Sequence, residues 1–171
     1  MNIISASELN TVLVEAINKI KEADTVCFNT CNFLYTTGCR FSELNLDRWS
    51  QDEEGNFIVQ PSKRNLERTF SPDELPEHFR NCFEAGNLFL YDRSSTTMER
   101  LIPRMLWPYD YFVGKQRLIT HIFRHNRFKQ LYKVLQSREA VHTKMGEKRE
   151  SSTLHYIFSE IKQVRSKDLT Q

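Results

Sequence analysis

The chain has 171 residues, of which 39% are hydrophobic and 12% aromatic, a composition that fits one folded domain and excludes an intrinsically disordered protein. Its formal net charge of +2 permits a nucleic-acid partner, but it is too small to indicate one by itself. No apolar run approaches the ~18 residues of a membrane span, and the N-terminus lacks a signal-peptide pattern. The sequence therefore predicts a soluble, intracellular protein with no membrane partner.

The first half of the sequence predicts helices followed by a small β-hairpin. Ser5 and Glu8 form a capping box, and apolar residues then recur at helical spacing. A second helix is predicted over residues 25–37, where Gly38 can adopt the left-handed conformation that ends helices, and a short third helix over residues 42–47. The segments "DEEGNFIVQ" and "LERTF" are typical of strands, and the loop "PSKRN" joins them.

The second half of the sequence predicts mostly helices. Ser71, Pro72 and Glu74 mark a helix start, and "WPYDYFVGKQ" is interpreted as a loop. Further helices are predicted over residues 96–106, 121–135, 138–145 and 150–164. There is no strand–helix alternation and no GxGxxG or GKS/T phosphate loop. The sequence therefore predicts an α+β domain, mostly helical, with one small antiparallel sheet or hairpin.

The cysteines give no indication of a metal site. Cys27, Cys31, Cys39 and Cys82 form no CxxC pair and no ligand set with histidine. We therefore expect reduced thiols, with Cys27 and Cys31 as small packing residues one helical turn apart. The sequence predicts neither a bound metal nor another cofactor.

Four separated motifs carry residue types that suit phosphate chemistry. "TGCRFSEL" places Arg40 after a glycine turn, and "QPSK" places Lys63 on the hairpin loop. "HIFRH" carries His121 and Arg124, and "SSTLHYI" carries Tyr156. Taken alone, each residue is more often a surface charge, a core histidine or a packing aromatic than a catalyst. It is their combination that points to a shared site.

These motifs resemble those of the tyrosine recombinases, which form the phage integrase family, and in particular those of its lambda-integrase-like members. The family has its first arginine in T-G-x-R-x-S-E-L, its lysine in a β-hairpin, its second arginine in H-x-x-R-H and its nucleophile in S/T-T-x-x-Y. All four occur here in the family order, across nearly the whole chain. The resemblance implies a single catalytic domain over residues 1–171, with the family's N-terminal core-binding domain absent from this chain. It also implies double-stranded DNA as partner, and a place in the cytoplasm or nucleoid of a bacterial or virus-infected cell.

The resemblance further implies a role for each motif residue. Arg40 and Arg124 would donate paired hydrogen bonds to the phosphate and stabilise the charge of the pentacoordinate transition state. Tyr156 would attack the phosphorus atom without a metal, which leaves a 3′-phosphotyrosyl link and a free 5′ hydroxyl. His121 would accept the phenol proton or orient the phosphate, and Lys63 would protonate the leaving 5′ oxygen.

Glu147 departs from the family pattern. The position nine residues before the tyrosine commonly holds histidine or tryptophan, and here it holds Glu147. A carboxylate beside a phosphate repels it instead of donating a hydrogen bond. Three alternatives follow: Glu147 points away from the site, it is protonated, or Lys148 or Arg149 supplies the missing donor.

Two further groups of residues point to partners. Basic residues near the proposed site are expected to contact backbone phosphates, and they are Arg64, Arg68, Arg127, Lys129, Lys144, Lys148 and Arg149. An apolar stripe follows Tyr156 and consists of Ile157, Phe158, Ile161 and Val164. This C-terminal segment packs either on its own domain or on a neighbouring protomer, and the second alternative predicts self-association on DNA as a dimer or tetramer.

The leading interpretation is the catalytic domain of a site-specific DNA recombinase or integrase of a mobile element, which cleaves and rejoins DNA strands. A first alternative is a catalytically weakened DNA-binding or regulatory homologue with the same fold, which is favoured by Glu147 and by the absent core-binding domain. A second rival is a type IB topoisomerase-like enzyme, which relaxes DNA by the same chemistry. A third is a helical interaction module in which the four motifs are coincidental.

Overall fold

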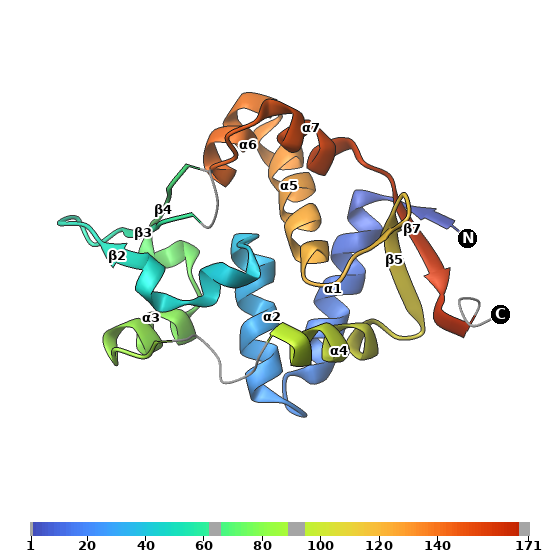
Figure 1. The fold of residues 1–171 in the computed structure, drawn as a ribbon, viewed down its shortest axis with the longest axis horizontal. Coiled ribbons are helices and arrows are strands. Elements are labelled where there is room, and N and C mark those ends of the chain that lie inside the picture. The colour runs from blue at the N-terminus through green and yellow to red at the C-terminus, as the bar shows by residue number, and fades with distance from the viewer. Residues whose placement is uncertain (1, 62–65, 89–94, 168–171) are drawn as a thin grey trace.

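The computed structural model describes residues 2–61, 66–88 and 95–167. It is a mostly helical α+β fold with two small antiparallel sheets at opposite ends (Figure 1), which confirms the predicted fold class and adds a second sheet. The helices are α1 (Ala6–Ile20), α2 (Thr25–Thr37), α3 (Glu77–Glu84), α4 (Ser95–Leu106), α5 (His121–Leu135), α6 (Arg138–Met145) and α7 (Glu150–Phe158). The strands are β1 (Asn2–Ile4), β2 (Trp49–Gln51), β3 (Phe57–Val59), β4 (Arg68–Phe70), β5 (Tyr109–Val113), β6 (Gln116–Arg117) and β7 (Ile161–Arg165).

The predicted helix ends are confirmed where a capping residue sets them. Ser5 and Glu8 exchange the hydrogen bonds of a capping box at the start of α1. Gly38 ends α2 with a φ of 67°. Helices α5 and α6 begin and end at the predicted residues, and α4 begins one residue before its predicted start. None of the described helices is both long and apolar enough to span a membrane.

The sheet β2–β3–β4 contains the predicted hairpin. Strand β3 pairs antiparallel with β4, with Val59 opposite Arg68, and β2 pairs with the other edge of β3. Strand β2 was not predicted, because its three residues are too few to display an alternating pattern. The loop between β3 and β4 includes Lys63 and Arg64, which lie outside the described residues.

Two predicted helix starts are 3₁₀ turns instead. Residues 42–47 were predicted as one helix but fall into Phe41–Leu44 and Leu46–Arg48. The capping box at Ser71 opens the short turn Pro72–Glu74, after which α3 begins. These turns are three or four residues long, which is the usual length of a 3₁₀-helix.

The sheet β1–β7–β5–β6 corrects two predictions. The segment "WPYDYFVGKQ" is not a loop: it contains β5 and the first residue of β6, and these strands pair around Gly114, whose φ of 59° allows the tight turn. The helix predicted over residues 150–164 ends at Phe158, and the chain continues as β7 between β1 and β5. Nζ of Lys129 donates to the carbonyls of Ile157 and Ser159, so a side chain satisfies backbone groups where α7 ends.

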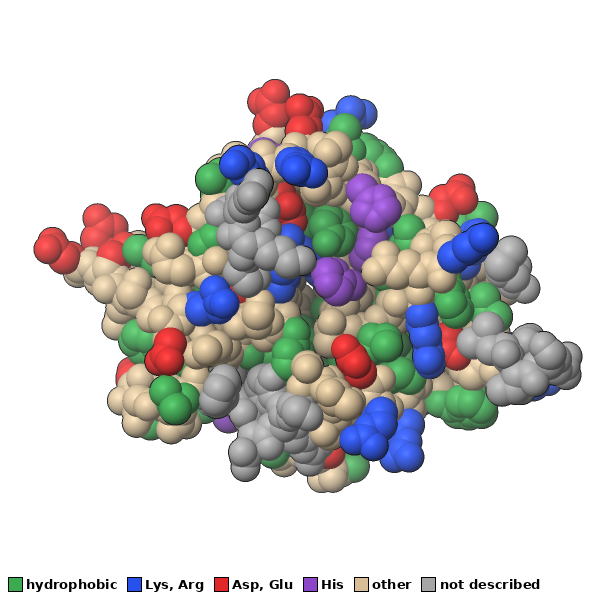
Figure 2. Space-filling model, in the orientation of Figure 1, with side chains coloured by type: hydrophobic (Ala, Val, Ile, Leu, Met, Phe, Trp, Pro, Cys, Tyr) green, Lys and Arg blue, Asp and Glu red, His purple; other side chains and the backbone are tan. Residues whose placement is uncertain are grey.

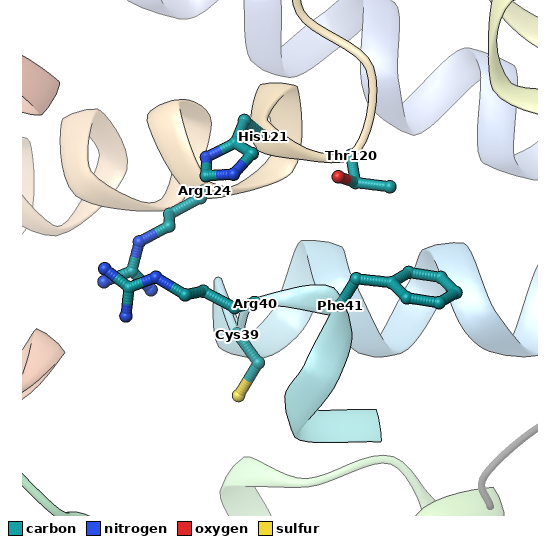
Figure 3. A pocket seen from close by; sticks show the side chains of 6 residues that line it. All are labelled: Cys39, Arg40, Phe41, Thr120, His121 and Arg124. Atoms are coloured by element: carbon teal, nitrogen blue, oxygen red, sulfur yellow. The ribbon is translucent and has the colours of Figure 1, made fainter. Parts of the chain in front are cut away.

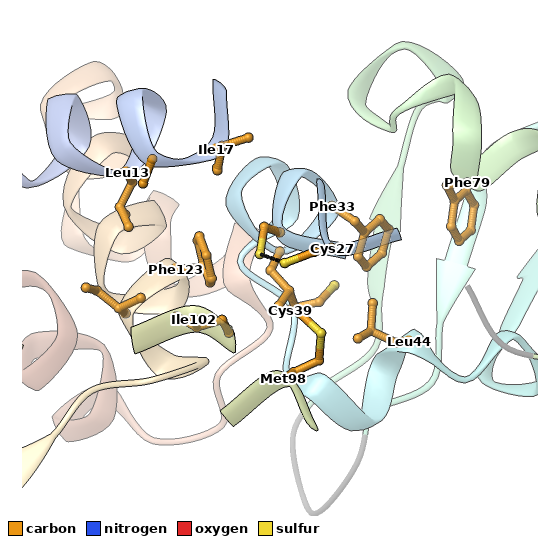
Figure 4. Close-up of a cluster of buried hydrophobic side chains, with 14 of the residues drawn as sticks. Leu13, Ile17, Cys27, Phe33, Cys39, Leu44, Phe79, Met98, Ile102 and Phe123 are labelled. Carbon is orange, nitrogen blue, oxygen red and sulfur yellow. Dashed lines mark hydrogen bonds between the residues drawn. The ribbon is translucent and has the colours of Figure 1, made fainter. Parts of the chain in front are cut away.

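Two clusters of buried side chains hold these elements together. The larger cluster joins α1, α2, α4 and α5 to the β2–β3–β4 sheet and includes Leu13, Phe33, Met98 and Phe123 (Figure 4). Cys27 and Cys31 pack within it as predicted, with their sulfur atoms 4.0 Å apart. The smaller cluster lies between α5, α6 and α7 and consists of Phe128, Leu131, Val141, Met145 and Ile157. Helix α5 therefore contributes to both clusters.

Candidate active site

One face of α5 carries four side chains of the site. His121, Arg124, His125 and Phe128 follow one another at intervals of three, one and three residues, so they lie along one side of the helix. His121 is exposed at the first residue of α5, whereas the other three are buried. The predicted motif "HIFRH" thus places its two histidines and its arginine on one face because it forms the first turns of a helix.

Arg40 reaches the same place from the segment that follows α2. The carbonyl of Gly38 accepts a hydrogen bond from Nη1 of Arg124 at 2.7 Å. A β-carbon at Gly38 would lie 2.8 Å from atoms of both Arg127 and Met145, so only glycine permits this close approach. The two guanidinium groups lie together beside a small pocket (Figure 3), which is lined by Cys39, Arg40, Phe41, Thr120, His121 and Arg124.

Glu147 lies between the two arginines. Its Oε1 accepts hydrogen bonds from Nη2 of Arg40 at 2.9 Å and from Nη2 of Arg124 at 2.5 Å, and the residue is only 3% exposed. The alternative in which Glu147 points away from the site is therefore excluded. Lys148 and Arg149 are exposed next to it in the sequence. A single carboxylate thus joins the two arginines, which come from distant parts of the chain.

Tyr156 lies against the same face of α5. Its ring stacks on Phe128 with centroids 4.5 Å apart and an interplanar angle of 8°, and it meets the ring of His125 at 4.7 Å. The guanidinium carbon of Arg124 lies 5.4 Å from the centroid of the Tyr156 ring. Tyr156 is half-buried against the smaller cluster, so it packs as a structural aromatic would and also lies beside an arginine of the pocket.

His125 is a buried neutral base beside Tyr156. Burial, followed by the charges of Lys129 and His155, lowers the pKa of its imidazole from 6.5 to about 3. Its Nδ1 has no hydrogen-bond partner among the described residues. The motif "HIFRH" contains His125, but the sequence alone predicts no role for it, because its contact with Tyr156 depends on how α7 packs against α5.

His125 should make the stability of the protein depend on pH. Between pH 6.5 and pH 3 the unfolded chain binds a proton at this residue and the folded chain does not, so stability falls as the pH falls through this window. Between pH 7 and pH 5 we expect His125→Asn to lose about 2 kcal/mol less unfolding free energy than the wild type. Urea unfolding at both pH values measures this, with His78→Asn, at a half-buried site on α3, as control. Equal losses in His125→Asn and wild type would contradict it.

The predicted DNA-contacting residues lie in different environments in the structure. Arg68 and Lys129 are buried and bind backbone carbonyls, and Lys144 pairs with Glu74 at 2.5 Å. Arg127 is half-buried, and burial lowers the pKa of its guanidinium. The exposed members are Lys148 and Arg149, whereas Arg64, like Lys63, is outside the described residues.

Among the predicted catalytic residues, the structure brings together Arg40, His121, Arg124, Glu147 and Tyr156.

The site opens on the face drawn in Figure 2. Histidine side chains gather near the middle of this face, beside a hollow in which basic, acidic and hydrophobic side chains lie. In Figure 1 this is the region where α5 and α7 lie above the end of α2. The site is therefore accessible from this face of the molecule.

Comparison with known proteins gives structural matches only. No protein-family model matches the chain, and no curated protein matches its sequence. The fold is similar to that of the site-specific recombinase XerH in a post-cleavage complex with its difH substrate, at 16% identity and a TM-score of 0.60, over 87% of this chain and 47% of that chain. It is also similar to XerA recombinase, at 16% identity and a TM-score of 0.61, over 99% of this chain and 63% of that chain.

A third similar structure is the integrase of the Tn1549 transposon in complex with transposon right-end DNA, at 13% identity and a TM-score of 0.50, over 91% of this chain and 61% of that chain. This chain spans roughly half to three fifths of the length of these recombinases. Nearly all of it is covered in each comparison. The chain has the fold of a tyrosine recombinase catalytic domain.

Proposed function

We propose that the chain acts as the catalytic domain of a site-specific DNA recombinase or integrase, which cleaves and rejoins strands through a 3′-phosphotyrosyl intermediate without a metal. The observation that carries the proposal is that Arg40 and Arg124, from distant segments, meet at one pocket, with the ring of Tyr156 beside Arg124. Two guanidinium groups beside a phenol are the groups that a metal-free attack on a phosphodiester requires.

Arg124 has a donor that fits a phosphate oxygen. Its Nη1 binds the Gly38 carbonyl and its Nη2 binds Glu147, but its buried Nε has no partner among the described residues. A buried N–H without an acceptor costs roughly 1–3 kcal/mol, which a bound oxyanion would recover. Arg40 would supply the second guanidinium, in the role that the resemblance implies.

Two different residues would carry out the two proton transfers of the reaction. A neutral phenol is a weak nucleophile, so Tyr156 needs a proton acceptor and a positive surrounding potential. His121 lines the pocket beside both arginines and is our candidate for accepting that proton or orienting the phosphate. Lys63, in the loop between β3 and β4, would protonate the leaving 5′ oxygen.

Double-stranded DNA is the proposed partner. The exposed Lys148 and Arg149 precede α7 and are our candidates for backbone phosphate contacts, with Arg64 from the β3–β4 loop. Self-association as a dimer or tetramer on DNA also stays a proposal. In the C-terminal segment, Ile161 is buried in its own sheet whereas Phe158 is half exposed, so Phe158 is the apolar side chain available to a neighbouring protomer.

A covalent-adduct experiment tests the proposed function. The chain is incubated with a pool of nicked suicide duplexes whose sequence is randomised around the nick, and protease-sensitive protein–DNA adducts are collected. We expect an adduct with the wild type and none with Tyr156→Phe, because the ring remains but the nucleophilic oxygen is gone. Tyr132→Phe is the matched control, since Tyr132 packs against Phe158 and the same buried cluster as Tyr156 but does not line the pocket. An adduct that persists in Tyr156→Phe would contradict the proposal.

One observation favours a second candidate function. Glu147 already occupies both arginines of the pocket, which is what a catalytically weakened DNA-binding or regulatory homologue would contain. That candidate predicts duplex binding without an adduct from any member of the pool. The same experiment therefore separates the two functions.

A further inference from the structure

Glu147 occupies the position that an oxyanion would take on the arginine pair. Guanidinium groups that converge on one oxygen atom form an anion site, and here the oxygen is Oε1 of Glu147, 2.9 Å from Arg40 and 2.5 Å from Arg124. The neighbouring pocket has a volume of about 10 Å³, which is close to the room that one water molecule needs. A DNA phosphate and this carboxylate therefore compete for the same guanidinium groups.

Glu147 does not use every donor of the pair. Nε of Arg124 is buried without a partner among the described residues, while both of its Nη atoms are bound. A phosphate group has several acceptor oxygens, so it can replace Oε1 and also reach Nε. The site is thus more complete with phosphate than with the carboxylate.

The turn that carries Glu147 is attached to the strand that follows the β3–β4 loop. The N–H of Leu66 donates to the carbonyl of Gly146 at 2.9 Å, and Nε of Arg68 donates to the carbonyl of Lys144 at 3.2 Å. Gly146 has a φ of 66°, and a β-carbon there would lie 2.7 Å from the Leu66 carbonyl oxygen, so turn and strand are in direct contact. These contacts hold the backbone of the turn that carries Glu147.

We propose that Glu147 is an internal competitor that closes the phosphate site by occupying both arginines until a DNA phosphate displaces it. The inference rests on the proposed function, because it takes a DNA phosphate as the ligand of Arg40 and Arg124, and it adds how that site is regulated. In the closed state Glu147 offsets one of the two positive charges and occupies an Nη2 donor of each arginine, so free phosphate does not bind. In the open state phosphate replaces the carboxylate on both arginines.

Thermal unfolding of the Glu147→Gln chain tests the competitor. Glutamine keeps the shape of the side chain and removes its charge, and melting is compared in chloride and in inorganic phosphate at equal ionic strength. We expect the wild type to melt at one temperature in both buffers. The variant should melt lower in chloride, because two guanidinium groups then face each other without an anion, and should regain roughly 3 °C or more in phosphate.

Asp110→Asn is the matched control. Asp110 is also a buried carboxylate paired with an arginine, Arg117, but it lies on β5 in the other sheet. It should lose the same stability in both buffers. A second readout is duplex affinity at fixed salt, which Glu147→Gln should raise by roughly tenfold or more, because no carboxylate then has to leave the arginines before the DNA phosphate binds.

The outcomes separate the competitor from the proposed enzyme. A Glu147→Gln chain that folds only in phosphate would support the competitor. An equal phosphate response in wild type and variant would overturn it, as would a variant that is unfolded in both buffers, since phosphate then does not replace the carboxylate. Neither readout needs DNA cleavage. A phosphate response without any covalent adduct would therefore contradict the proposed enzyme activity and support the role of Glu147 as competitor. A covalent adduct without a phosphate response would support the proposed enzyme activity and contradict the role of Glu147 as competitor.

Discussion

Replacing Arg40 with lysine should lower the rate of adduct formation by roughly 10²–10³-fold. Lysine keeps the positive charge that pairs with Glu147 but loses the planar fork that can hold two phosphate oxygens at once. Arg40 is partly exposed, with 16% of its side chain accessible, and Glu147 retains Arg124 in the variant, so we expect the fold to remain. The measurement is the single-turnover rate of adduct formation on the suicide duplex.

The control for Arg40→Lys is the same change at Arg138, which is exposed at the start of α6. It should leave the rate within about a factor of two of the wild type, because a surface arginine outside the pocket contributes little. Equal rates for Arg40→Lys and the wild type would contradict the role given to the Arg40 fork.

Replacing Arg68 with methionine should destabilise the protein by about 3 kcal/mol, because two buried carbonyls lose their donor. Nη2 of Arg68 donates to the carbonyl of Thr37 at 2.6 Å, and its Nε donates to the carbonyl of Lys144. The residue is 5% exposed, and burial lowers the pKa of its guanidinium. It therefore ties β4 to the ends of α2 and α6, which are the ends that position Arg40 and Glu147.

Urea unfolding measures the effect of Arg68→Met, with Arg104→Met at an exposed position of α4 as control. The control should change stability by less than about 0.5 kcal/mol. If Arg68→Met instead kept its stability and bound duplex DNA more weakly, with a smaller salt slope, Arg68 would be the phosphate contact that its position in the sequence first indicated.

The helices around the site could be predicted because their signals are local. Ser5, Gly38 and the apolar spacing of α5 each act within a few residues, so the helix ends they set were predicted correctly. Strand β7 could not be predicted in this way. Its apolar residues continue the helical spacing of α7, and what makes them a strand is pairing with β1 and β5, which lie far away in the sequence.

The site was predictable in its residue types but not in its contacts. The four motifs pointed to Arg40, His121, Arg124 and Tyr156, and the structure brings these four together. The sequence marked Glu147 as unusual, yet a carboxylate that binds both arginines depends on a turn after α6 that local patterns do not fix. Charge counting likewise could not show which basic residues are buried, because Arg68 and Lys129 differ from Lys148 and Arg149 only through tertiary packing.

The most direct test of the proposed chemistry is the identity of the protein–DNA bond. The adduct is digested with trypsin and its DNA is trimmed to a nucleotide, and the mass of the peptide over residues 150–162, which contains Tyr156, is measured. We expect this peptide to carry a nucleotide through its 3′ phosphate, and we expect the released strand to end in a 5′ hydroxyl that a kinase can label. DNA-bound protein with no modified peptide, or a nucleotide attached at any residue other than Tyr156, would contradict the account.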